Sequence, residues 1–499
     1  MLDYYPLAIR AFKDGMMERR RGHIVAVSST FGIVPFGRTV CYSATKFGVR
    51  GLMEGLNEEF YMNGYSNDIF VTCVYPGFVA TRKEFMEYLE QLGCRVPINT
   101  PDEVADTAID AVLRNRCEVI TSSLIMRIML KFYAATQSSF GRESKQMALP
   151  KERSMAFREQ YFQHVDGAYE AASVRRKRPD KPLSLDRLEK NVRFVLVEVF
   201  PKVAKVLLLL VPVLVRDFVQ FLLPAKKKSI SNQLALVTGG GNGLGRALCF
   251  RLAQEGCSVA VADIDLVGAR RTAEEVRTRF GVKADAFHVD VSDYGSVTKL
   301  KEAIESSLGN VDILVNNAAL LAMLSLSEGK PEDVQRIVNV NLLSHFWTIR
   351  AFKDGMVERR RGHIVAICSL LGIVPFGRTI SYCATKFGVR GLMESLENEF
   401  YQDGLKNDIH TTCVFPAGIR TRKGFVDLVK DIKLTVPLSS PEYVANLIVD
   451  AVRANKTEIV PSTWEMRLVA AIYPYMPKSL ILLVVDTVLG VTPVLTSRE

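Results

Sequence analysis

A long internal repeat limits what this chain of 499 residues can fold into. The segment that starts at Ala11, AFKDGMMERRRGHIVAVSST, returns at Ala351 as AFKDGMVERRRGHIVAICSL. The similarity continues more weakly past Pro101 and Pro441, always at the same offset of 340 residues and without a gap. Solenoid repeats are much shorter, about 20–45 residues, and more numerous. The repeat therefore indicates a duplicated domain.

The two copies are unequal in length. Strand–helix alternation from Leu234 to Asn341 precedes the repeated part of the second copy, whereas in the first copy Met1 already aligns with Asn341. The first copy is therefore the second half of a domain without its first half. The predicted divisions are a truncated first copy at 1–141, a linker at 142–190, an apolar anchor segment at 191–228 and a complete second copy at 229–499.

Composition excludes several classes of protein. A hydrophobic content of 48% is too high for a wholly disordered chain. The net charge of +10 is modest for this length, and the basic residues are not interleaved with aromatic ones, so no nucleic-acid partner is expected. Nine scattered cysteines form no CxxC pair, which argues against a disulfide framework and a zinc site; no metal is expected. The N-terminus has no apolar run typical of a signal peptide.

The segment 191–228 is apolar but broken. Its longest uncharged run, Val206–Val215, contains Pro212 and is followed by Arg216. A spanning helix needs about 20 apolar residues, so we expect this segment to lie in a bilayer face, with Lys226–Lys228 at the headgroups. The alternative is a buried helix pair. The apolar end of the chain, 467–499, is open to the same two interpretations.

A glycine-rich turn follows the first short apolar run of the second copy. Within LALVTGGGNGLGRALCFRLAQEG the glycines have a TGxxxGxG spacing between a strand-like run and a helical pattern. Glycines let a backbone approach a pyrophosphate closely, and the N–H groups of the next helix N-terminus can bind it. We predict cofactor contacts in this turn from Gly239, Asn242, Gly243, Leu244 and Gly245.

Three further strand ends carry polar residues. Asp263 ends SVAVAD, about 20 residues beyond the turn, where a carboxylate binds adenosine ribose hydroxyls and repels a 2′-phosphate. Asp263 and Asn242 together favour NAD over NADP. Asp290 follows the next strand, and Asn317 and Ala318 lie in VDILVNNAA. Strands that alternate with helices predict an α/β fold, a doubly wound parallel sheet with helices on both faces, preceded by a partial second copy of the same fold.

A tyrosine and a lysine in SYCATK are candidates for proton transfer. Tyr382 and Lys386 are four residues apart and share one face of a helix, and Ser369 ends the apolar run HIVAICS. A lysine cation and a nicotinamide cation near a phenol favour its ionised form. Tyr382 would then exchange a proton with a substrate hydroxyl, and Ser369 would donate a hydrogen bond to the same oxygen.

These motifs in this order resemble the short-chain dehydrogenase/reductase family. TGGGNGLG, NNAA, NVN, Ser369 and YCATK carry the resemblance, which covers essentially all of the second copy. It implies a Ser–Tyr–Lys–Asn tetrad of Ser369, Tyr382, Lys386 and Asn341. In that family the asparagine distorts its helix and holds a water in a proton relay to the lysine. Lys386 would also contact the cofactor, together with residues after the sixth strand: Pro416, Ile419 and Thr421.

The apolar segment before the second copy is similar to the membrane-associated 17-beta-hydroxysteroid and epidermal retinol dehydrogenase subgroup. The resemblance implies a Rossmann-fold oxidoreductase that uses NAD(H) on a lipophilic alcohol or carbonyl, such as a retinoid, steroid or fatty alcohol. It also implies an endoplasmic reticulum membrane or lipid-droplet location, with the catalytic domain on the cytosolic side. Two alternatives remain: an NADPH-dependent carbonyl reductase, and a membrane or lipid-droplet scaffold with a vestigial dehydrogenase fold.

The sequence departs from the family pattern at two places. Ala319 stands where the family usually has glycine after Asn-Asn-Ala, which tightens the nicotinamide site. The second copy reads Pro416-Ala417-Gly418 where the first copy keeps the usual Pro-Gly. The register of Ile419 and Thr421 against the family motif is therefore open by one residue.

The first copy keeps Ser29, Tyr42 and Lys46 at the same spacings but has no glycine turn, no acidic ribose ligand and no counterpart of Asn341. We expect it to have no dehydrogenase activity of its own. Its helices correspond to those that form the dimer interface in the family, so it would dock on the second copy as an internal pseudo-dimer, or the protein would form a homodimer. Alternatively, the chain joins two adjacent genes.

Overall fold

The computed structural model describes residues 4–81, 98–121, 227–321, 330–377, 379–421 and 438–473. The predicted linker and nearly all of the predicted anchor segment lie outside these residues, as does the end of the chain from residue 474. Contacts divide the chain into two compact units. One contains Met1–Gly77, Asp102–Thr121 and Lys226–Glu499, and the other contains Phe78–Pro101 and Ser122–Ala225. The core of the first copy and the whole second copy therefore belong to the same unit.

The second copy contains a seven-stranded sheet in which every paired strand is parallel. The strand order is β12-β11-β10-β9-β6-β7-β8. The direction of winding reverses between β6 and β9, and in open α/β sheets ligands bind beyond the carboxyl ends of strands at such a point. The strands are β6 (Leu234–Thr238), β7 (Ser258–Asp263), β8 (Ala284–His288), β9 (Ile313–Asn316), β10 (Gly362–Ile367), β11 (Ile409–Val414) and β12 (Glu458–Ile459).

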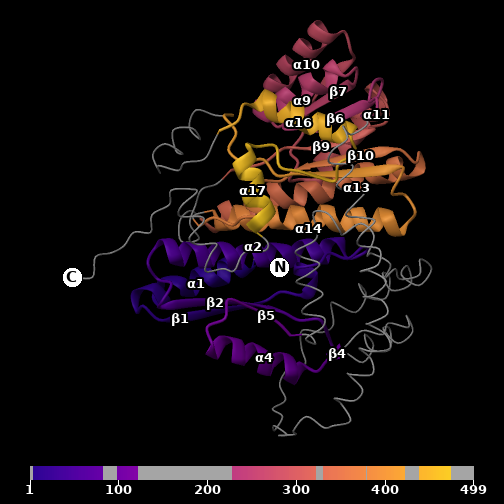
Figure 1. Ribbon diagram of the computed structural model, residues 1–499. Helices are drawn as coiled ribbons and strands as arrows, with labels where there is room; N and C mark the ends of the chain where they lie inside the picture. Colours follow the sequence, from indigo (N-terminus) through magenta and orange to yellow (C-terminus); the bar gives the residue numbers. More distant parts are fainter. Residues whose placement is uncertain are drawn as a thin grey trace. The chain divides into compact units, whose positions relative to one another are not determined.

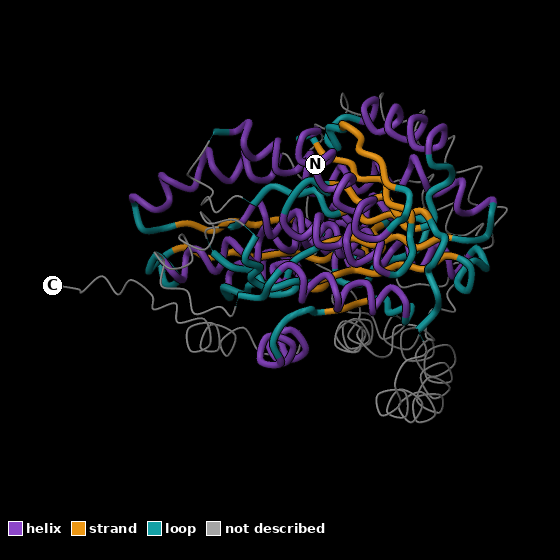
Figure 2. The backbone as a smooth tube through the Cα atoms, turned by 90° about the horizontal axis from the view of Figure 1, so that it is seen from above, coloured by secondary structure: helices purple, strands orange, loops and turns teal. Residues whose placement is uncertain are grey.

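Helices cover both faces of this sheet (Figures 1 and 2). α9 contacts both α10 and α16 in one layer, and α11, α13 and α14 belong to the other. The helices are α9 (Gly243–Gln254), α10 (Leu266–Phe280), α11 (Tyr294–Ser307), α12 (Pro331–Val338), α13 (Ser344–Glu358), α14 (Ile380–Gln402), α16 (Pro441–Arg453) and α17 (Trp464–Ile472). The predicted doubly wound α/β fold is confirmed.

Local sequence explains where several of these helices begin and end. Asp265 and Asp293 are N-caps whose carboxylates accept backbone N–H groups of the first turn of α10 and α11. Gly281 ends α10 in the left-handed conformation, at φ 67°. A π-helical turn, η3 (Asn339–Leu343), joins α12 to α13, and a short 3-10 turn, η4 (Leu370–Gly372), follows β10.

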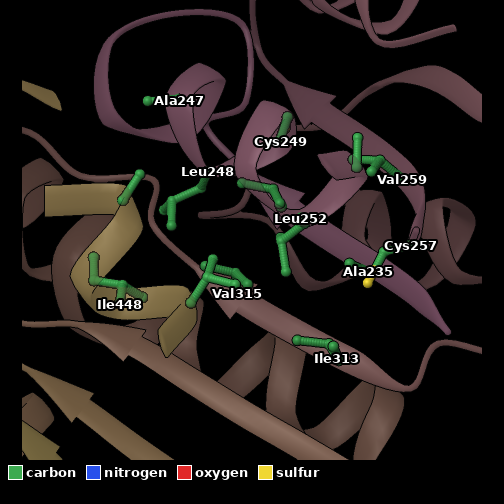
Figure 3. Close-up of a cluster of buried hydrophobic side chains, with 14 of the residues drawn as sticks. Ala235, Ala247, Leu248, Cys249, Leu252, Cys257, Val259, Ile313, Val315 and Ile448 are labelled. Atoms are coloured by element: carbon green, nitrogen blue, oxygen red, sulfur yellow. The ribbon is translucent and has the colours of Figure 1, made fainter. Parts of the chain in front are cut away.

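The core of the second copy is formed by small and branched apolar side chains between the sheet and the layer of α9 and α16 (Figure 3). Leu248 and Leu252 of α9 pack against Ile313 and Val315 of β9, and Ile448 of α16 joins the same cluster. Continuous runs of buried residues in β6, β7 and β9 are typical of parallel strands covered on both faces.

The described residues of the first copy form the matching part of the fold, together with a short two-stranded sheet of β3 (Phe78–Val79) and β4 (Ile98–Asn99). Its parallel sheet has the order β1-β2-β5 and the same register as β10, β11 and β12. Val25 and Val27 of the edge strand β1 are 44% and 49% exposed, because no strand equivalent to β9 pairs with it among the described residues. The elements are α1 (Tyr4–Glu18), β1 (Gly22–Val27), η1 (Thr30–Gly32), α2 (Val40–Met62), β2 (Ile69–Tyr75), α4 (Pro101–Leu113) and β5 (Glu118–Ile120).

Two of the three lysines expected at the headgroups lie within the described residues, whereas Lys226 does not. Lys227 is exposed and forms an ion pair with Asp450 at 2.9 Å, and Lys228 Nζ lies 3.2 Å from His363 Nδ1. Both lysines therefore contact residues of the second copy.

Candidate active site

The glycine turn between β6 and α9 leaves no room for side chains. Gly239 and Gly243 have φ values of 66° and 53°, which favour glycine. A Cβ on Gly245 would lie 2.0 Å from the Gly239 carbonyl oxygen. The Asn317 amide closes the turn from β9 by donating to the carbonyls of Thr238 and Gly239 at 3.0 and 3.1 Å. The turn is thus a tight backbone cradle that fits a dinucleotide phosphate.

The first turn of α9 completes this cradle. Asn242, its N-cap, makes no side-chain hydrogen bond to the first turn of the helix. The N–H groups at the N-terminus of a helix carry a partial positive charge and attract anions. Thr421, which was predicted to contact the cofactor, lies against this turn, 3.3 Å from the place of a Cβ on Gly243.

The carboxylate of Asp263 lies at the end of β7, beside the same turn. Its oxygens accept the N–H groups of Gly241 at 2.8 Å and Asp265 at 2.9 Å. The side chain is buried and lines the same cavity as the glycines. Asp263 therefore fixes the glycine turn and also places a negative charge where the ribose of a dinucleotide would bind.

Ser369, Tyr382 and Lys386 come together across η4 and α14. Tyr382 is 9% exposed, and Lys386 Nζ lies 5.5 Å from the centre of its ring. Lys386 also donates to the Ile367 carbonyl at 2.9 Å. Ser369 is the N-cap of η4, and its Oγ accepts the Leu371 N–H at 3.1 Å. The short turn therefore orients the serine, and the long helix orients the tyrosine and lysine.

Burial is the strongest influence on ionisation in this cluster. It raises the pKa of Tyr382 above the ordinary value, while a hydrogen bond with Ser369 opposes the shift. Burial also lowers the pKa of Lys386. The sequence argument favoured a phenolate beside two cations; in the protein by itself, Tyr382 is a protonated phenol at neutral pH. Ionisation therefore depends on further positive charge near the ring.

Asn341 lies behind the cavity and is completely buried. Its side chain accepts the Leu320 N–H at 2.7 Å and donates to the Leu320 carbonyl at 2.8 Å. The residue sits within the π-helical turn η3, so the helix is distorted at this point. Asn341 thereby holds the segment that follows the Asn-Asn-Ala-Ala motif.

One cavity of about 810 Å³ joins these groups. Apart from Asn341, every residue predicted for the site lines it: Gly239, Asn242, Gly243, Leu244, Gly245, Asp263, Asp290, Asn317, Ala318, Ser369, Tyr382, Lys386, Pro416, Ile419 and Thr421. The lining also includes apolar side chains, among them Leu370, Leu371, Val374, Phe376 and Met466. The glycine turn, Ser369, Tyr382 and a set of apolar side chains therefore line the same cavity.

Two residues near the site were not anticipated from the sequence. His345 is fully buried, one helical turn beyond Asn341; its Nδ1 has no hydrogen-bond partner, and burial and the charge of Lys386 lower its pKa to about 3. Its spacing of four residues from Asn341 could have predicted that both side chains lie on the same face of a helix. Met466 comes from α17, far along the chain, and no local pattern connects it to the cavity.

The corresponding residues of the first copy have a different environment. Tyr42 is 44% exposed, compared with 9% for Tyr382. Lys46 still donates to the Val27 carbonyl, at 3.2 Å, as Lys386 does to Ile367. The local geometry of the lysine is therefore preserved, but among the described residues no strands like β6 to β9 pair with the sheet of the first copy.

Comparison with known proteins identifies the family. The family profile described as short chain dehydrogenase matches residues 5–88 and 233–424. The chain belongs to the short-chain dehydrogenase/reductase family. It is therefore an NAD(P)-dependent oxidoreductase that acts on CH–OH groups. Two matching segments are also consistent with the predicted tandem arrangement.

Curated relatives in this family include hydroxysteroid dehydrogenases. The chain is 32% identical over 275 residues to 17-beta-hydroxysteroid dehydrogenase 13 of Rattus norvegicus, covering 54% of this chain and 89% of the relative. It is 32% identical over 265 residues to estradiol 17-beta-dehydrogenase 11 of Mus musculus, covering 52% and 86%. It is 34% identical over 231 residues to short-chain dehydrogenase/reductase family 16C member 6 of Bos taurus, covering 46% and 72%. The predicted family and subgroup are confirmed.

Two solved structures match part of the chain. A short-chain dehydrogenase/reductase from Burkholderia phymatum in complex with NAD matches with a TM-score of 0.45 and 23% identity, over 49% of this chain and 92% of that one. An alcohol dehydrogenase from Thermococcus sibiricus complexed with 5-hydroxy-NADP matches with a TM-score of 0.41 and 22% identity, over 46% and 96%. As for the predicted anchor, none of the helices in the described part of the chain has the length and apolar character needed to cross a membrane.

Proposed function

We propose that the second copy transfers hydride between NAD(H) and a lipophilic alcohol or carbonyl, such as a retinoid, a hydroxysteroid or a fatty alcohol. The observation that carries the proposal is that Tyr382 and Ser369 line the same cavity as the glycine turn and a set of apolar side chains. A substrate oxygen would lie beside Tyr382, while its apolar body would be buried against side chains that include Leu371, Phe376 and Met466.

The proposed mechanism assigns one role to each polar group. The residues of the glycine turn would hold an oxidised nicotinamide dinucleotide, which would supply a hydride acceptor and a positive charge when bound. Tyr382 removes the hydroxyl proton of the alcohol, and Ser369 donates a hydrogen bond to the same oxygen. Lys386, held by the Ile367 carbonyl, favours ionised Tyr382. Asn341 keeps the loop at Leu320 in place behind the lysine.

NAD is the proposed cofactor, because Asp263 occupies the ribose side of the site. A buried carboxylate there accepts hydroxyl hydrogen bonds and repels a 2′-phosphate. Its two backbone hydrogen bonds keep it fixed in that position. The glycine turn, Asp290, Asn317, Ala318, Pro416, Ile419 and Thr421 would hold the remainder of the cofactor.

We also propose an association with the endoplasmic reticulum membrane or lipid droplets, with the catalytic domain on the cytosolic side. The support is the apolar sequence around Val206–Val215 and the apolar cavity, which suits a substrate dissolved in lipid. The working unit is proposed to be a single chain in which the truncated first copy takes the place of a second subunit.

The decisive experiment replaces Tyr382 by phenylalanine in the full chain, solubilised in detergent. The substrates are panels of retinoids, hydroxysteroids and long-chain alcohols, each with NAD or NADP. We expect Tyr382→Phe to lower kcat by about 10²–10⁴-fold, with NADH affinity unchanged in a fluorescence titration. The matched control is Tyr42→Phe in the first copy, which should leave kcat unaltered.

Three outcomes would contradict parts of this proposal. A silent Tyr382→Phe variant would favour a scaffold with a vestigial fold. A preference for NADPH and carbonyl substrates would favour the reductase alternative and would contradict the role of Asp263. Loss of activity in Tyr42→Phe would contradict the assignment of a single active site to the second copy.

A further inference from the structure

The helices α2 of the first copy and α14 of the second copy lie side by side in one compact unit (Figure 1). Glycines allow their close approach. A Cβ on Gly51 would lie 2.6 Å from Phe387 Cγ, and a Cβ on Gly391 would lie 2.7 Å from Phe47 Cγ. Residues 51 and 391, like 47 and 387, are related by the repeat offset, so each phenylalanine fills the space beside the other copy's glycine. Such reciprocal contacts are typical of a two-fold interface.

A second reciprocal pair lies at the ends of the same helices. Gly37 faces the Gln402 side chain, and Gly377 faces Met62, each with 2.7 Å between the place of a Cβ and the nearest side-chain atom. These positions are also related by the offset of 340 residues. The two copies of the repeat are therefore related by a pseudo-two-fold axis that passes between α2 and α14.

One side chain of α14 and the residue that caps this helix form polar contacts with the first copy. Asn398, which is 4% exposed, donates its amide to the Pro35 carbonyl at 3.2 Å. Arg38 also pairs with Asp403 at 3.4 Å. A buried amide without a partner would destabilise the fold, so the first copy supplies a hydrogen bond that this surface requires.

The interface reaches the immediate neighbours of the proposed catalytic groups. Phe387 follows Lys386 in sequence, and its ring packs beside Gly51. A Cβ on Gly388 would lie 3.0 Å from Leu342, the neighbour of Asn341, and 3.3 Å from the Ala44 carbonyl of α2. The first copy thus supports the back of the turn that carries Lys386 and the adjoining π-helical turn.

The substrate side is connected to the first copy as well. α17 contributes Met466 to the cavity and packs with Leu370 and Val374. Tyr473, directly after α17, is buried, and the charges of Glu54 and Glu58 of α2 act on its phenol, adding to the rise in pKa that burial causes. The end of α17 therefore lies close to the acidic side of α2.

We infer that α2 of the first copy is a built-in positioning surface for the active site of the second copy. Residues Phe47 and Gly51 hold α14 so that Tyr382 and Lys386 face the cavity. The inference rests on the proposed function for its catalytic part, whereas the packing of α2 on α14 within one chain is independent of it.

The packing is tested by a single new cysteine. A Cβ at Gly55 would lie 3.9 Å from Cys383 Cβ, within the range of about 3.5–4.5 Å found in disulfides. Treatment of full-length Gly55→Cys with diamide should yield a disulfide within one chain, seen as a monomer on a non-reducing gel and as a 55–383 cross-linked peptide in mass spectrometry. The control, Gly55→Cys with Cys383→Ser, should not form it.

Either of two results would overturn the packing. A disulfide-linked dimer through the same two cysteines would mean that α2 of one chain covers α14 of another. Absence of the 55–383 peptide, with both thiols recovered free after denaturation, would mean that the helices do not meet. The wild-type chain should also have the mass of a monomer, 55.7 kDa, by light scattering with the detergent contribution subtracted.

The positioning role is tested by Phe47→Ala in the full chain. Removing the ring leaves a cavity against Gly391 and lets α14 shift, and misplacement of catalytic groups by about 1 Å can lower rates by about 10²-fold. We expect kcat to fall at least tenfold, with the KM for NAD nearly unchanged and the pH profile shifted to higher pH. Phe47→Leu should restore most of the activity.

The matched control is Val74→Ala, a buried truncation in β2 of the first copy that packs with Ala111 and Val119. It should destabilise the first copy without altering kcat. Equal kcat values for Phe47→Ala, Val74→Ala and the wild type would overturn positioning. If the wild type has no dehydrogenase activity, the proposed function fails. Hydrogen exchange then tests whether Phe47 holds α14 in place: α14 amides must exchange faster in Phe47→Ala than in Val74→Ala.

Discussion

Gly245 is the residue at which the candidate cofactor site tolerates the least change. Its missing side chain lets the first turn of α9 pass within contact distance of the Gly239 carbonyl, where a Cβ would be 2.0 Å away. Asn317 also lies within 2.7 Å of that position. The same atoms that close the turn from β9 therefore exclude any larger residue.

We predict that Gly245→Ala abolishes NADH binding. The methyl group must displace the glycine turn, and overpacking of this kind destabilises proteins by about 1–3 kcal/mol. Fluorescence titration with NADH measures the binding, and thermal unfolding measures the stability. The control is Gly295→Ala in α11, where a Cβ meets only the Asp293 side chain, at 3.4 Å or more. Normal NADH affinity in Gly245→Ala would contradict the proposed cradle.

Individual site residues were predictable from the sequence to different degrees. Four of them follow a predicted strand or lie in a short motif: Gly239, Asp263, Ser369 and Tyr382. Their spacing in the sequence was enough to predict that they lie at one edge of the sheet. The ionisation of Tyr382 was not predictable, because burial, which raises its pKa, arises from the whole surrounding fold. His345 lies one turn from Asn341, but only the folded helix shows that it faces the charge of Lys386.

At the scale of elements, β10 and β11 carry a buried histidine cluster at the end of the sheet away from the cavity. The rings of His363 and His410 are 5.8 Å apart, and His363 Nε2 lies 2.8 Å from Thr412 Oγ1. Burial lowers the pKa of both histidines, to about 4 for His410, with Lys228 adding to the shift and Asp408 opposing it at His410. Both rings are therefore neutral in the folded protein at neutral pH.

This cluster makes stability depend on pH. The folded-state pKa values lie below the unfolded value of about 6.5, so the unfolded chain binds more protons as the pH falls. The free energy of unfolding that depends on these neutral histidines is therefore highest above pH 6.5 and falls between about pH 6.5 and 4. We predict a falling melting temperature over that range and a smaller fall in His410→Gln. The control is His288→Gln, because His288 is exposed. If the melting temperature of His410→Gln fell with pH as steeply as that of the wild type, the prediction would be contradicted.

The alternation of strands and helices was predictable from LALVT, SVAVAD and the apolar run that ends in Ile367, since buried parallel strands are continuous apolar runs. Asp290 was expected at the end of its strand, but β8 ends at His288, because the next residues already turn toward α11. The exact turn geometry depends on hydrogen bonds such as that from Ser292 to Asp290.

At the scale of the whole molecule, the two copies differ in the strands that the structure describes. The first copy has β1, β2 and β5, and among the described residues no strands like β6 to β9 pair with them. We predict that NADH titration gives one bound equivalent per chain. A stoichiometry of two would contradict this, and the Gly245→Ala variant, which should bind none, is the control that assigns the site to the second copy.

The sequence by itself determined that the chain repeats part of one α/β fold, and which residues lie close to the ends of its strands. Those conclusions follow from local patterns, because strands, helices and glycine turns depend mainly on neighbouring residues. Only the tertiary structure decided that Phe47 and Phe387 pack beside each other's glycines, that Lys228 faces His363, and that Met466 closes the cavity. Such contacts join residues far apart in the chain, and packing rather than local pattern selects them.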